Sequence, residues 1–331
     1  MTATEIRTRP AQLSIYDKHP ELRRIPKEAY PKYVFLVLDG NSRWVKKVAR
    51  GAIHGNPQDA ETLRSGVEKL YGLFHTYAAE NPIIDAQYTG TVQELFENFR
   101  ELPIKDTVKQ LDKMHVLPLI GHLKGSEVLE TQLRRLRELP IDYVGAWGFS
   151  ADNFARPPEE VAGLMWLFEQ ELANHAQELK DNNSRFIHLG DKSKLPTRLQ
   201  DKLATLEEET AENSGQTFCL AVGFGGLNQV IRVGQQIIDS EHPRGTLMDA
   251  SMLEGYIDGN GSVPLSADLI ILPGRWQGLP YTSDLGLLNG KGTKLYFPKV
   301  YWPDTTTDHL VKGVIAYTKG RQNLGGRPDK K

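Results

Sequence analysis

The stretch from Asp39 to Arg43 reads DGNSR and carries side chains suited to handling a phosphate. Mg²⁺ in proteins is usually held by one or two carboxylates together with phosphate oxygens, so Asp39 is a candidate ligand. Arg43 offers a forked set of donors that matches phosphate oxygens, and Gly40 allows a close approach of the backbone. An ordinary strand-to-helix turn in which Asp39 caps the helix explains the same residues without a ligand.

The residues around this stretch predict a strand, a tight loop and the start of a helix. Residues 34–38 form a continuous apolar run, which suits a strand buried on both faces. Turn formers follow at 40–42, and a helix-compatible segment begins at Arg43. Backbone N–H groups at a helix start lack intrahelical partners and favour anions. The segment therefore predicts a phosphate site at the carboxyl end of a buried strand.

Five further apolar segments predict more strands, and most of them are separated by helical patterns. These segments are residues 141–150, 185–191, 217–226, 268–274 and 294–304. Strands that are apolar on both faces and alternate with helices are typical of α/β proteins. The sequence thus predicts a mainly parallel central sheet of about six strands surrounded by helices. Ligands in such sheets bind at the carboxyl ends of the strands.

Length and composition limit the class of protein. The chain has 331 residues, 39% of them hydrophobic, and forty basic residues nearly balance forty-two acidic ones. This balance gives no reason to expect a nucleic-acid partner. The single cysteine, Cys219, excludes a disulfide within the chain. The N-terminal stretch MTATEIRTRPAQ lacks an apolar core of signal-peptide length, and no run approaches the roughly 20 apolar residues of a membrane span, so we expect a cytoplasmic enzyme without a transmembrane segment.

Four ordered sequence blocks carry a resemblance to a known family. The blocks are DGNSRW at 39–44, FSADNFARPPEEV at 149–161, the stretch from IHLGD to AVGFGG at 187–226, and LYFPKVYWPD at 295–304; GHLKG at 121–125 is a weaker fifth. They resemble the cis-prenyltransferases, the undecaprenyl diphosphate synthase family. The resemblance covers roughly residues 31–50 and 115–315. It implies a single domain of residues 1–331, with an N-terminal arm at 1–30 and a helical insertion at 51–117.

The resemblance implies the roles of individual residues around one allylic diphosphate and Mg²⁺. The catalytic residues would be Asp39, which also holds the metal, and Asn41, Ser150 and Asn153; the diphosphate would be bound by Gly40, Arg43, Trp44, His122 and Arg156. Each has a plainer interpretation: His122 as a hydrogen-bonded structural histidine, and Ser150 or Asn153 as caps of the next helix. A competing alignment places Gly55-Asn56 where the family has Gly-His.

Several of the family's residues for a second diphosphate are missing. Alignment with that block places Leu272, Gly278 and Pro280 where the family has two arginines and a serine, and Lys294 where it has an acidic residue. We consider Arg275 and Lys294 as possible replacements at a second site. Without them a second diphosphate would lose several charged hydrogen bonds, each worth roughly 1.5–3 kcal/mol.

A helix predicted over 157–180 is apolar nearly all round at its start, which indicates either core packing or the wall of an apolar cavity. The aromatic residues considered for a prenyl cavity are Trp147, Phe149, Trp166 and Phe168, because aromatic ring faces stabilise cations. The resemblance also implies a homodimer formed through the later strands and helices.

These observations predict a Mg²⁺-dependent enzyme that ionises an allylic isoprenoid diphosphate. Prenyl transfer, by a cis or an irregular condensation, is the first interpretation. A terpene synthase that uses one diphosphate alone is the alternative, favoured by the missing second-site residues. A non-catalytic subunit of a heteromeric prenyltransferase is a third, and the intact DGNSRW, His122 and Arg156 argue against it.

Overall fold

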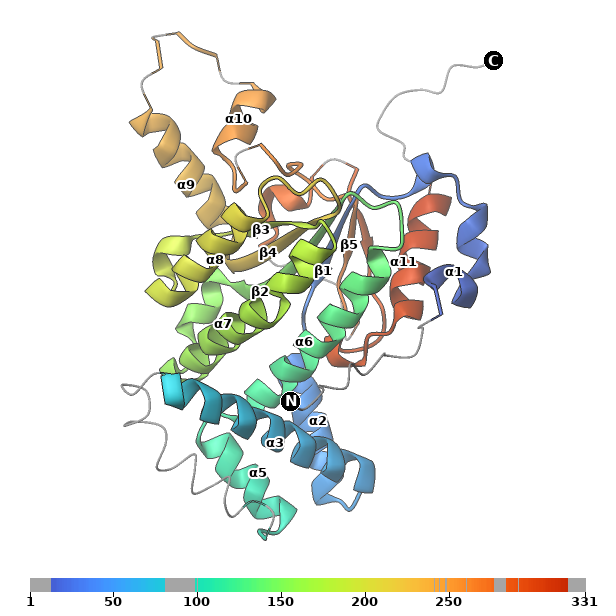
Figure 1. The fold of residues 1–331 in the computed structure, drawn as a ribbon, viewed down its shortest axis with the longest axis vertical. Coiled ribbons are helices and arrows are strands. Elements are labelled where there is room, and N and C mark those ends of the chain that lie inside the picture. The colour runs from blue at the N-terminus through green and yellow to red at the C-terminus, as the bar shows by residue number, and fades with distance from the viewer. Residues whose placement is uncertain are drawn as a thin grey trace, which may run out of the picture.

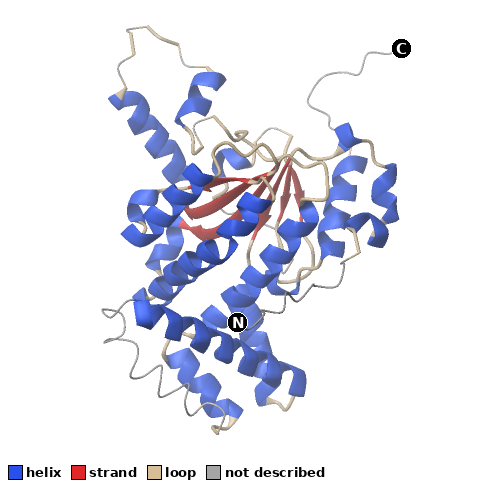
Figure 2. Ribbon diagram, in the orientation of Figure 1, coloured by secondary structure: helices blue, strands red, loops and turns tan. Residues whose placement is uncertain are grey.

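A six-stranded parallel sheet forms the centre of the chain (Figures 1 and 2). The structure is a computed structural model that describes residues 13–80, 99, 101–240, 242–243, 245–247, 249–259, 261–276, 284–290 and 292–320. The strand order is β3-β4-β2-β1-β5-β6. The strands are β1 (Tyr33–Val37), β2 (Tyr143–Ser150), β3 (Arg185–Leu189), β4 (Thr217–Phe224), β5 (Leu269–Ile271) and β6 (Lys294–Tyr296). The predicted parallel α/β sheet is confirmed.

β1 lies in the interior of the sheet, and all five of its residues are buried. Val34 pairs with Val144 of β2 on one side and with Leu269 of β5 on the other. Because all the strands are parallel, their carboxyl ends meet at one edge of the sheet. Asp39 follows β1 at that edge, close to the ends of β2 and β5.

Helices cover the sheet and extend below it in the view of Figure 1. The helices are α1 (Ile15–Lys18), α2 (Asn41–Ile53), α3 (Pro57–Glu80), α5 (Ile104–Lys113), α6 (Leu117–Leu136), α7 (Pro158–Asp181), α8 (Thr197–Glu209), α9 (Gly226–Asp239), α10 (Ala250–Tyr256) and α11 (Thr307–Lys319). The largest core cluster joins side chains of α2, α3, α6, α7 and α8 to those of β2, β3 and β4. A second cluster packs α1, α6 and α11 on β1, β2 and β5.

The segment predicted as an insertion, 51–117, contains the end of α2 together with α3 and α5. Leu63, Val67 and Leu70 of α3 are buried in the same core cluster as Ile120 of α6. α3 and α5 therefore pack against α2 and α6, and they lie at the bottom of Figure 1. Part of the predicted helical pattern, at 92–98, lies outside the described residues.

The predicted N-terminal arm is described from residue 13 onward. It contains α1 and two 3₁₀ turns, Pro20–Arg24 and Lys27–Ala29. Ile15 and Leu22 are buried against α6 and α11, which fixes the arm to the sheet. None of the helices in the described segments is both long enough and apolar enough to cross a bilayer.

Candidate active site

Asp39 is held between two arginines at the carboxyl edge of the sheet. Its Oδ1 accepts a hydrogen bond from Nη2 of Arg43 at 2.8 Å, and its Oδ2 accepts one from Nε of Arg275 at 2.9 Å. Arg43 also donates to the carbonyl oxygen of Gly274 at 2.9 Å and lies 5.4 Å from the ring centroid of Tyr301. The sequence brings Arg43 to Asp39 because the two are four residues apart at the start of α2.

Gly40 shapes the turn between β1 and α2. Its φ of 101° lies in the left-handed region that glycine tolerates, and a Cβ there would lie 2.6 Å from Cδ1 of Tyr301. No side chain caps α2. The backbone N–H groups of Asn41, Ser42 and Arg43 find no acceptor within the described segments. The α2 N-terminus is thus available to an anion beside Asp39.

The GHLKG block explains how His122 reaches this turn. A Cβ at Gly121 would lie less than 3.0 Å from the backbone oxygen of Asn41, and one at Gly125 would lie 2.6 Å from Oδ1 of the same residue. The two glycines therefore let α6 cross the start of α2 at close range. Nδ1 of His122 lies 3.2 Å from Nδ2 of Asn41, whose amide group also donates to the carbonyl of Leu38 at 3.1 Å.

This arrangement assigns the tautomer of His122. The Asn41 amide donates to Nδ1, so the ring hydrogen lies on Nε2. That Nε2 is buried and has no acceptor among the described residues. Burial, and then the nearby charge of Arg156, lower the pKa of His122 to about 3. His122 is therefore a neutral hydrogen-bond donor at physiological pH.

Ser150 and Asn153 have a structural role at the end of β2. They form a reciprocal capping box for the short 3₁₀ helix Ala151–Ala155, in which the Asn153 side chain accepts from the Ser150 N–H at 3.1 Å. Arg156 follows this turn and donates to Glu160 at 2.9 Å. The capping interpretation is confirmed for this pair, and the same residues also face a cavity.

A polar cavity of about 320 Å³ collects most of the predicted site residues. Those that line it are Asp39, His122, Trp147, Phe149, Ser150, Asn153, Arg156 and Arg275. Asp152 and Asp284 line it as well and were not anticipated from the sequence. Asp284 accepts hydrogen bonds from the backbone N–H of Leu227 at 3.1 Å, at the start of α9.

An apolar cavity adjoins the polar one. The two share Leu38, His122 and Gly148, and Asn41 lines the apolar cavity. Six leucines of α6 and α7 line it, together with Phe168, Phe218 and Leu220. The predicted apolar face of the 157–180 helix therefore contributes to a cavity, although Trp166 is buried in the core and does not line it.

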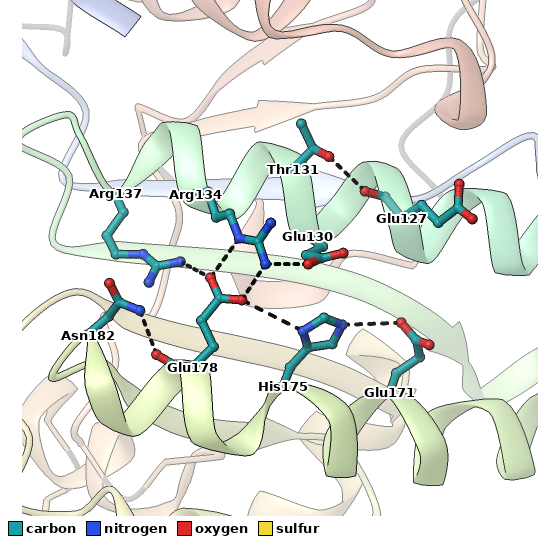
Figure 3. Close-up of polar contacts among 9 residues, drawn as sticks. All are labelled: Glu127, Glu130, Thr131, Arg134, Arg137, Glu171, His175, Glu178 and Asn182. Atoms are coloured by element: carbon teal, nitrogen blue, oxygen red, sulfur yellow. Dashed lines mark hydrogen bonds and ion pairs between the residues drawn. The ribbon is translucent and has the colours of Figure 1, made fainter. Parts of the chain in front are cut away.

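A network of charged residues also lines the apolar cavity, between α6 and α7 (Figure 3). Arg134 donates to Glu178 at 2.7 and 2.8 Å and also to Glu130, and Arg137 donates to Glu178 at 3.1 Å. These bonds, chiefly from Arg134, lower the pKa of Glu178 to about 2. This network was not predicted from the sequence. The sequence indicates it only through charged residues three or four positions apart on the segments that form α6 and α7.

The same network contains a set of possible metal ligands. Glu130, His175 and Glu178 offer ligand atoms within 4.8 Å of one another. The guanidinium of Arg134 already contacts both glutamates, so a cation is present among these groups. A hydrogen bond to Glu171 raises the pKa of His175.

The sequence matches a family model described as putative undecaprenyl diphosphate synthase over residues 109–325, which is more than half of the chain. The chain belongs to this family. The match begins after the DGNSRW block, so Asp39 and Arg43 lie outside it. An isoprenyl transferase of Thermotoga maritima is 32% identical over 216 residues, covering 65% of this chain and 91% of the relative.

A second family member is a ditrans,polycis-undecaprenyl-diphosphate synthase of Haemophilus influenzae, described as specific for (2E,6E)-farnesyl diphosphate. It is 27% identical over 221 residues, covering 66% of this chain and 89% of the relative. Among solved structures, a lavandulyl diphosphate synthase of Lavandula x intermedia in complex with dimethylallyl diphosphate has a TM-score of 0.63 and 22% identity. It covers 90% of this chain and 100% of the solved chain, and this likeness supports the fold alone.

Two residues expected at a diphosphate in this family lie elsewhere. Trp44 is buried in the core, and its Nε1 donates to Asp304 at 2.7 Å. Lys294 begins β6, at the opposite end of the strands from the site, and its Nζ donates to the carbonyls of Tyr317 and Gly320 at 2.6 and 2.7 Å. Lys294 thus satisfies carbonyls at the end of α11, so the structure does not bring it to either cavity.

Proposed function

We propose that this chain transfers the prenyl group of an allylic isoprenoid diphosphate to an acceptor, as an enzyme of isoprenoid biosynthesis. One observation carries the proposal: a polar cavity lined by Asp39, His122 and Arg156 adjoins an apolar cavity between α6 and α7. A prenyl diphosphate has the same division into a charged head and an apolar chain. The relatives named isoprenyl transferase support the reaction class.

The polar cavity suits the leaving group of this reaction. When the bond between C1 and the diphosphate oxygen breaks, the electron pair leaves with the diphosphate, and negative charge grows on its oxygens. Three kinds of donor are in place before the reaction: the neutral Nε2–H of His122, the guanidinium of Arg156, and the N–H groups at the start of α2 that have no acceptor among the described residues. Donors of this kind stabilise developing charge in a site of low polarity.

Asp39 is the residue that would hold Mg²⁺. A carboxylate has about four lone-pair positions, and the two arginines occupy two of them. Mg²⁺ is commonly held by one or two carboxylates together with substrate phosphates, so the donor set fits a metal that arrives with the diphosphate. When bound, the metal would neutralise charge on the departing diphosphate. Asp39 would then orient both the metal and the two arginines.

The apolar cavity is proposed as the site of the prenyl chain. Six leucines of the two helices line it, with Phe168 and Phe218 among the larger side chains, and the charged network between α6 and α7 lines part of the same wall. Leu38, Gly148 and His122 line both cavities, so the apolar cavity adjoins the polar one beside His122. A chain bound there would have its C1 near the donors described above.

Product analysis tests the proposed function. The protein is incubated with Mg²⁺ and geranyl, farnesyl or geranylgeranyl diphosphate, each with and without isopentenyl or dimethylallyl diphosphate. We expect a prenylated product and released diphosphate. Asp39→Asn should lower the rate by about 10²–10³-fold, as loss of a preorganised charge-stabilising group does. Asp181→Asn, a substitution at the end of α7, serves as the matched control.

The products also distinguish the alternatives. A hydrocarbon or alcohol formed from one diphosphate alone, without any acceptor being consumed, identifies a terpene synthase. Absence of turnover with every combination, or turnover that Asp39→Asn leaves unchanged, contradicts the assignment of an active site to this cavity.

We further infer that the chain forms a homodimer through α9. One side of this helix exposes Leu227, Val230, Ile231 and Ile238, with exposed fractions between 52% and 77%. Apolar residues gathered on one outer face favour contact with another protein surface. Light scattering coupled to size exclusion should give a dimer, and Ile231→Lys should give a monomer. A monomeric parent protein contradicts the proposal.

A further inference from the structure

One step of the proposed prenyl transfer has no residue assigned to it so far. When a double bond of the acceptor forms the new bond to C1, positive charge is left on a carbon of the acceptor. That charge is neutralised when a neighbouring carbon gives up a proton to a base. A side chain in this role must offer a lone pair to the polar cavity.

Most of the polar side chains around this cavity cannot accept a proton. Asp39 accepts hydrogen bonds from two arginines and is the residue proposed to hold Mg²⁺. Nδ1 of His122 accepts a hydrogen bond from the Asn41 amide, and Nε2 already carries the ring hydrogen. Arginine keeps its proton in proteins. Among the acidic residues that line the cavity, Asp152 and Asp284 remain.

Of these two carboxylates, that of Asp284 is held in place. Both of its oxygens accept from the backbone N–H of Leu227 at 3.1 Å, and the Asp284 carbonyl oxygen accepts from the N–H of Gly226 at 3.0 Å. The two chain segments are in close contact there, because a Cβ at Gly226 would clash with the backbone of Gly286. The Asp152 carboxylate has no hydrogen-bond partner among the described residues. Asp284 is therefore the preorganised group.

Asp284 lies across the cavity from Asp39. Its Oδ2 is 3.2 Å from where a Cβ of Gly225 would be, directly after β4, whereas Asp39 follows β1. β2 lies between β4 and β1, so about 10 Å separates the ends of these two strands. The N–H of Leu227 takes at most two of the roughly four lone-pair positions of the carboxylate. An acceptor between the two aspartates would have the leaving group on one side and a carboxylate on the other.

We propose that Asp284 is the base of the transfer, and that its carboxylate takes the proton that the acceptor loses after the new carbon–carbon bond forms. This assignment rests on the proposed function of the Asp39 side. The C1–O bond of the allylic diphosphate breaks, and its electron pair leaves with the diphosphate. The double bond of the acceptor supplies the electron pair of the new bond to C1. The C–H electron pair of the neighbouring carbon becomes a new double bond, and the proton passes to Asp284 and then to water.

Substitutions that keep the helix cap but remove the base separate the two roles of Asp284. The side-chain oxygen of asparagine or serine can still accept from the N–H of Leu227, so Asp284→Asn and Asp284→Ser should fold as the parent does. Asp249→Asn is the matched control. Asp249 accepts from the N–H of Met252 at 2.9 Å at the start of α10, and it is not among the described residues that line the polar cavity.

Each protein is given Mg²⁺, the allylic diphosphate that the parent uses best, and an acceptor with or without deuterium at the carbon that loses the proton. Isopentenyl diphosphate is labelled at C2, and dimethylallyl diphosphate is labelled in its methyl groups. The measurements are kcat, KM, the deuterium isotope effect on kcat, the products, and unfolding in urea.

We expect both Asp284 variants to lower kcat by about 10²–10⁴-fold, as loss of a positioned base does, with little change in the KM of the allylic diphosphate. The isotope effect should rise, because proton loss becomes the slowest step, and some product should be an alcohol formed when water captures the cation. Asp249→Asn should match the parent.

Kinetics and products like those of the parent in both Asp284 variants overturn the proposal. A fall in kcat that accompanies unfolding of both variants, or that leaves the isotope effect unchanged, assigns Asp284 a structural role and overturns it too. Failure of the parent to turn over any pair of substrates contradicts the proposed function instead.

Discussion

Substituting Gly121 by alanine should separate α6 from α2, because no space exists for a methyl group at that crossing. The Cβ would lie less than 3.0 Å from the backbone oxygen of Asn41. A main-chain carbonyl cannot rotate away as a side chain can, so the helices must move apart. His122, the next residue on α6, would move away from the Asn41 amide that now lies 3.2 Å from its Nδ1.

The expected change in stability is the difference between two effects. Replacing glycine by alanine within a helix stabilises it by about 0.5–1 kcal/mol. Forcing an additional methyl group into a packed core costs typically about 1–3 kcal/mol. The cost of the additional methyl group should exceed the gain in helix stability here, because the methyl group would contact the backbone oxygen of Asn41, which cannot rotate away. We expect Gly121→Ala to lower the free energy of unfolding by about 1–2 kcal/mol.

Urea unfolding of Gly121→Ala and Gly72→Ala measures this effect with a matched control. A Cβ at Gly72, within α3, meets no atom of the described residues within 4 Å, so that variant should be as stable as the parent or slightly more stable. The activity of Gly121→Ala should also fall, since its neutral imidazole donor is displaced. If Gly121→Ala gains stability as Gly72→Ala does and keeps full activity, the close crossing does not position His122, and this reasoning is refuted.

Two further predictions concern charge. Burial lowers the pKa of His122 to about 3 in the folded protein. Between about pH 6.5 and pH 3 this imidazole is therefore protonated in the unfolded chain and neutral in the folded one. The free energy of unfolding should consequently fall as the pH drops through this range. Between pH 7 and pH 5 the free energy of unfolding, measured in urea, should fall by about 2 kcal/mol more for the parent than for His122→Gln. An equal fall in both proteins contradicts the assignment of His122 as a buried, neutral imidazole. Glu178→Gln should cost about 1–3 kcal/mol in the same assay, because Arg134 and Arg137 lose their shared carboxylate. Glu209→Gln removes a more exposed ion pair, with Lys180, and its free energy of unfolding should stay within about 0.5 kcal/mol of that of the parent. An equal loss of stability in both variants contradicts the larger contribution assigned to Glu178.

The sheet was predictable because its strands are marked by local composition. A strand buried on both faces must be apolar throughout, and residues 34–38 show this directly. The turn at Gly40 was also visible, since few other residues adopt its positive φ. The packing of α3 and α5 was not predictable, because an amphipathic pattern does not specify which surface a helix will contact.

The candidate site was predictable where several residues of one block act together. Asp39 and Arg43 are one helical turn apart, so their contact follows from spacing. The contact of Arg275 with Asp39 joins residues 236 positions apart, and only the folded sheet brings them together. Lys294 failed as a site candidate because a position at the amino end of a strand cannot face a site at the carboxyl end. A residue type suitable for phosphate binding does not determine the direction of its side chain.

The hydrogen bond between Asn41 and His122 spans 81 positions of the chain, most of them in the predicted insertion. Closing a flexible loop costs entropy that grows only with the logarithm of its length. Lengthening this loop from about 16 to 81 positions adds roughly 1.4 kcal/mol by that relation, less than one buried leucine contributes. The α3 helix buries Leu63, Val67 and Leu70 in the core cluster that includes α6. Burial of these three side chains therefore offsets the entropy of closing the longer loop. A long segment can therefore occur between two residues of a site while leaving their contact intact.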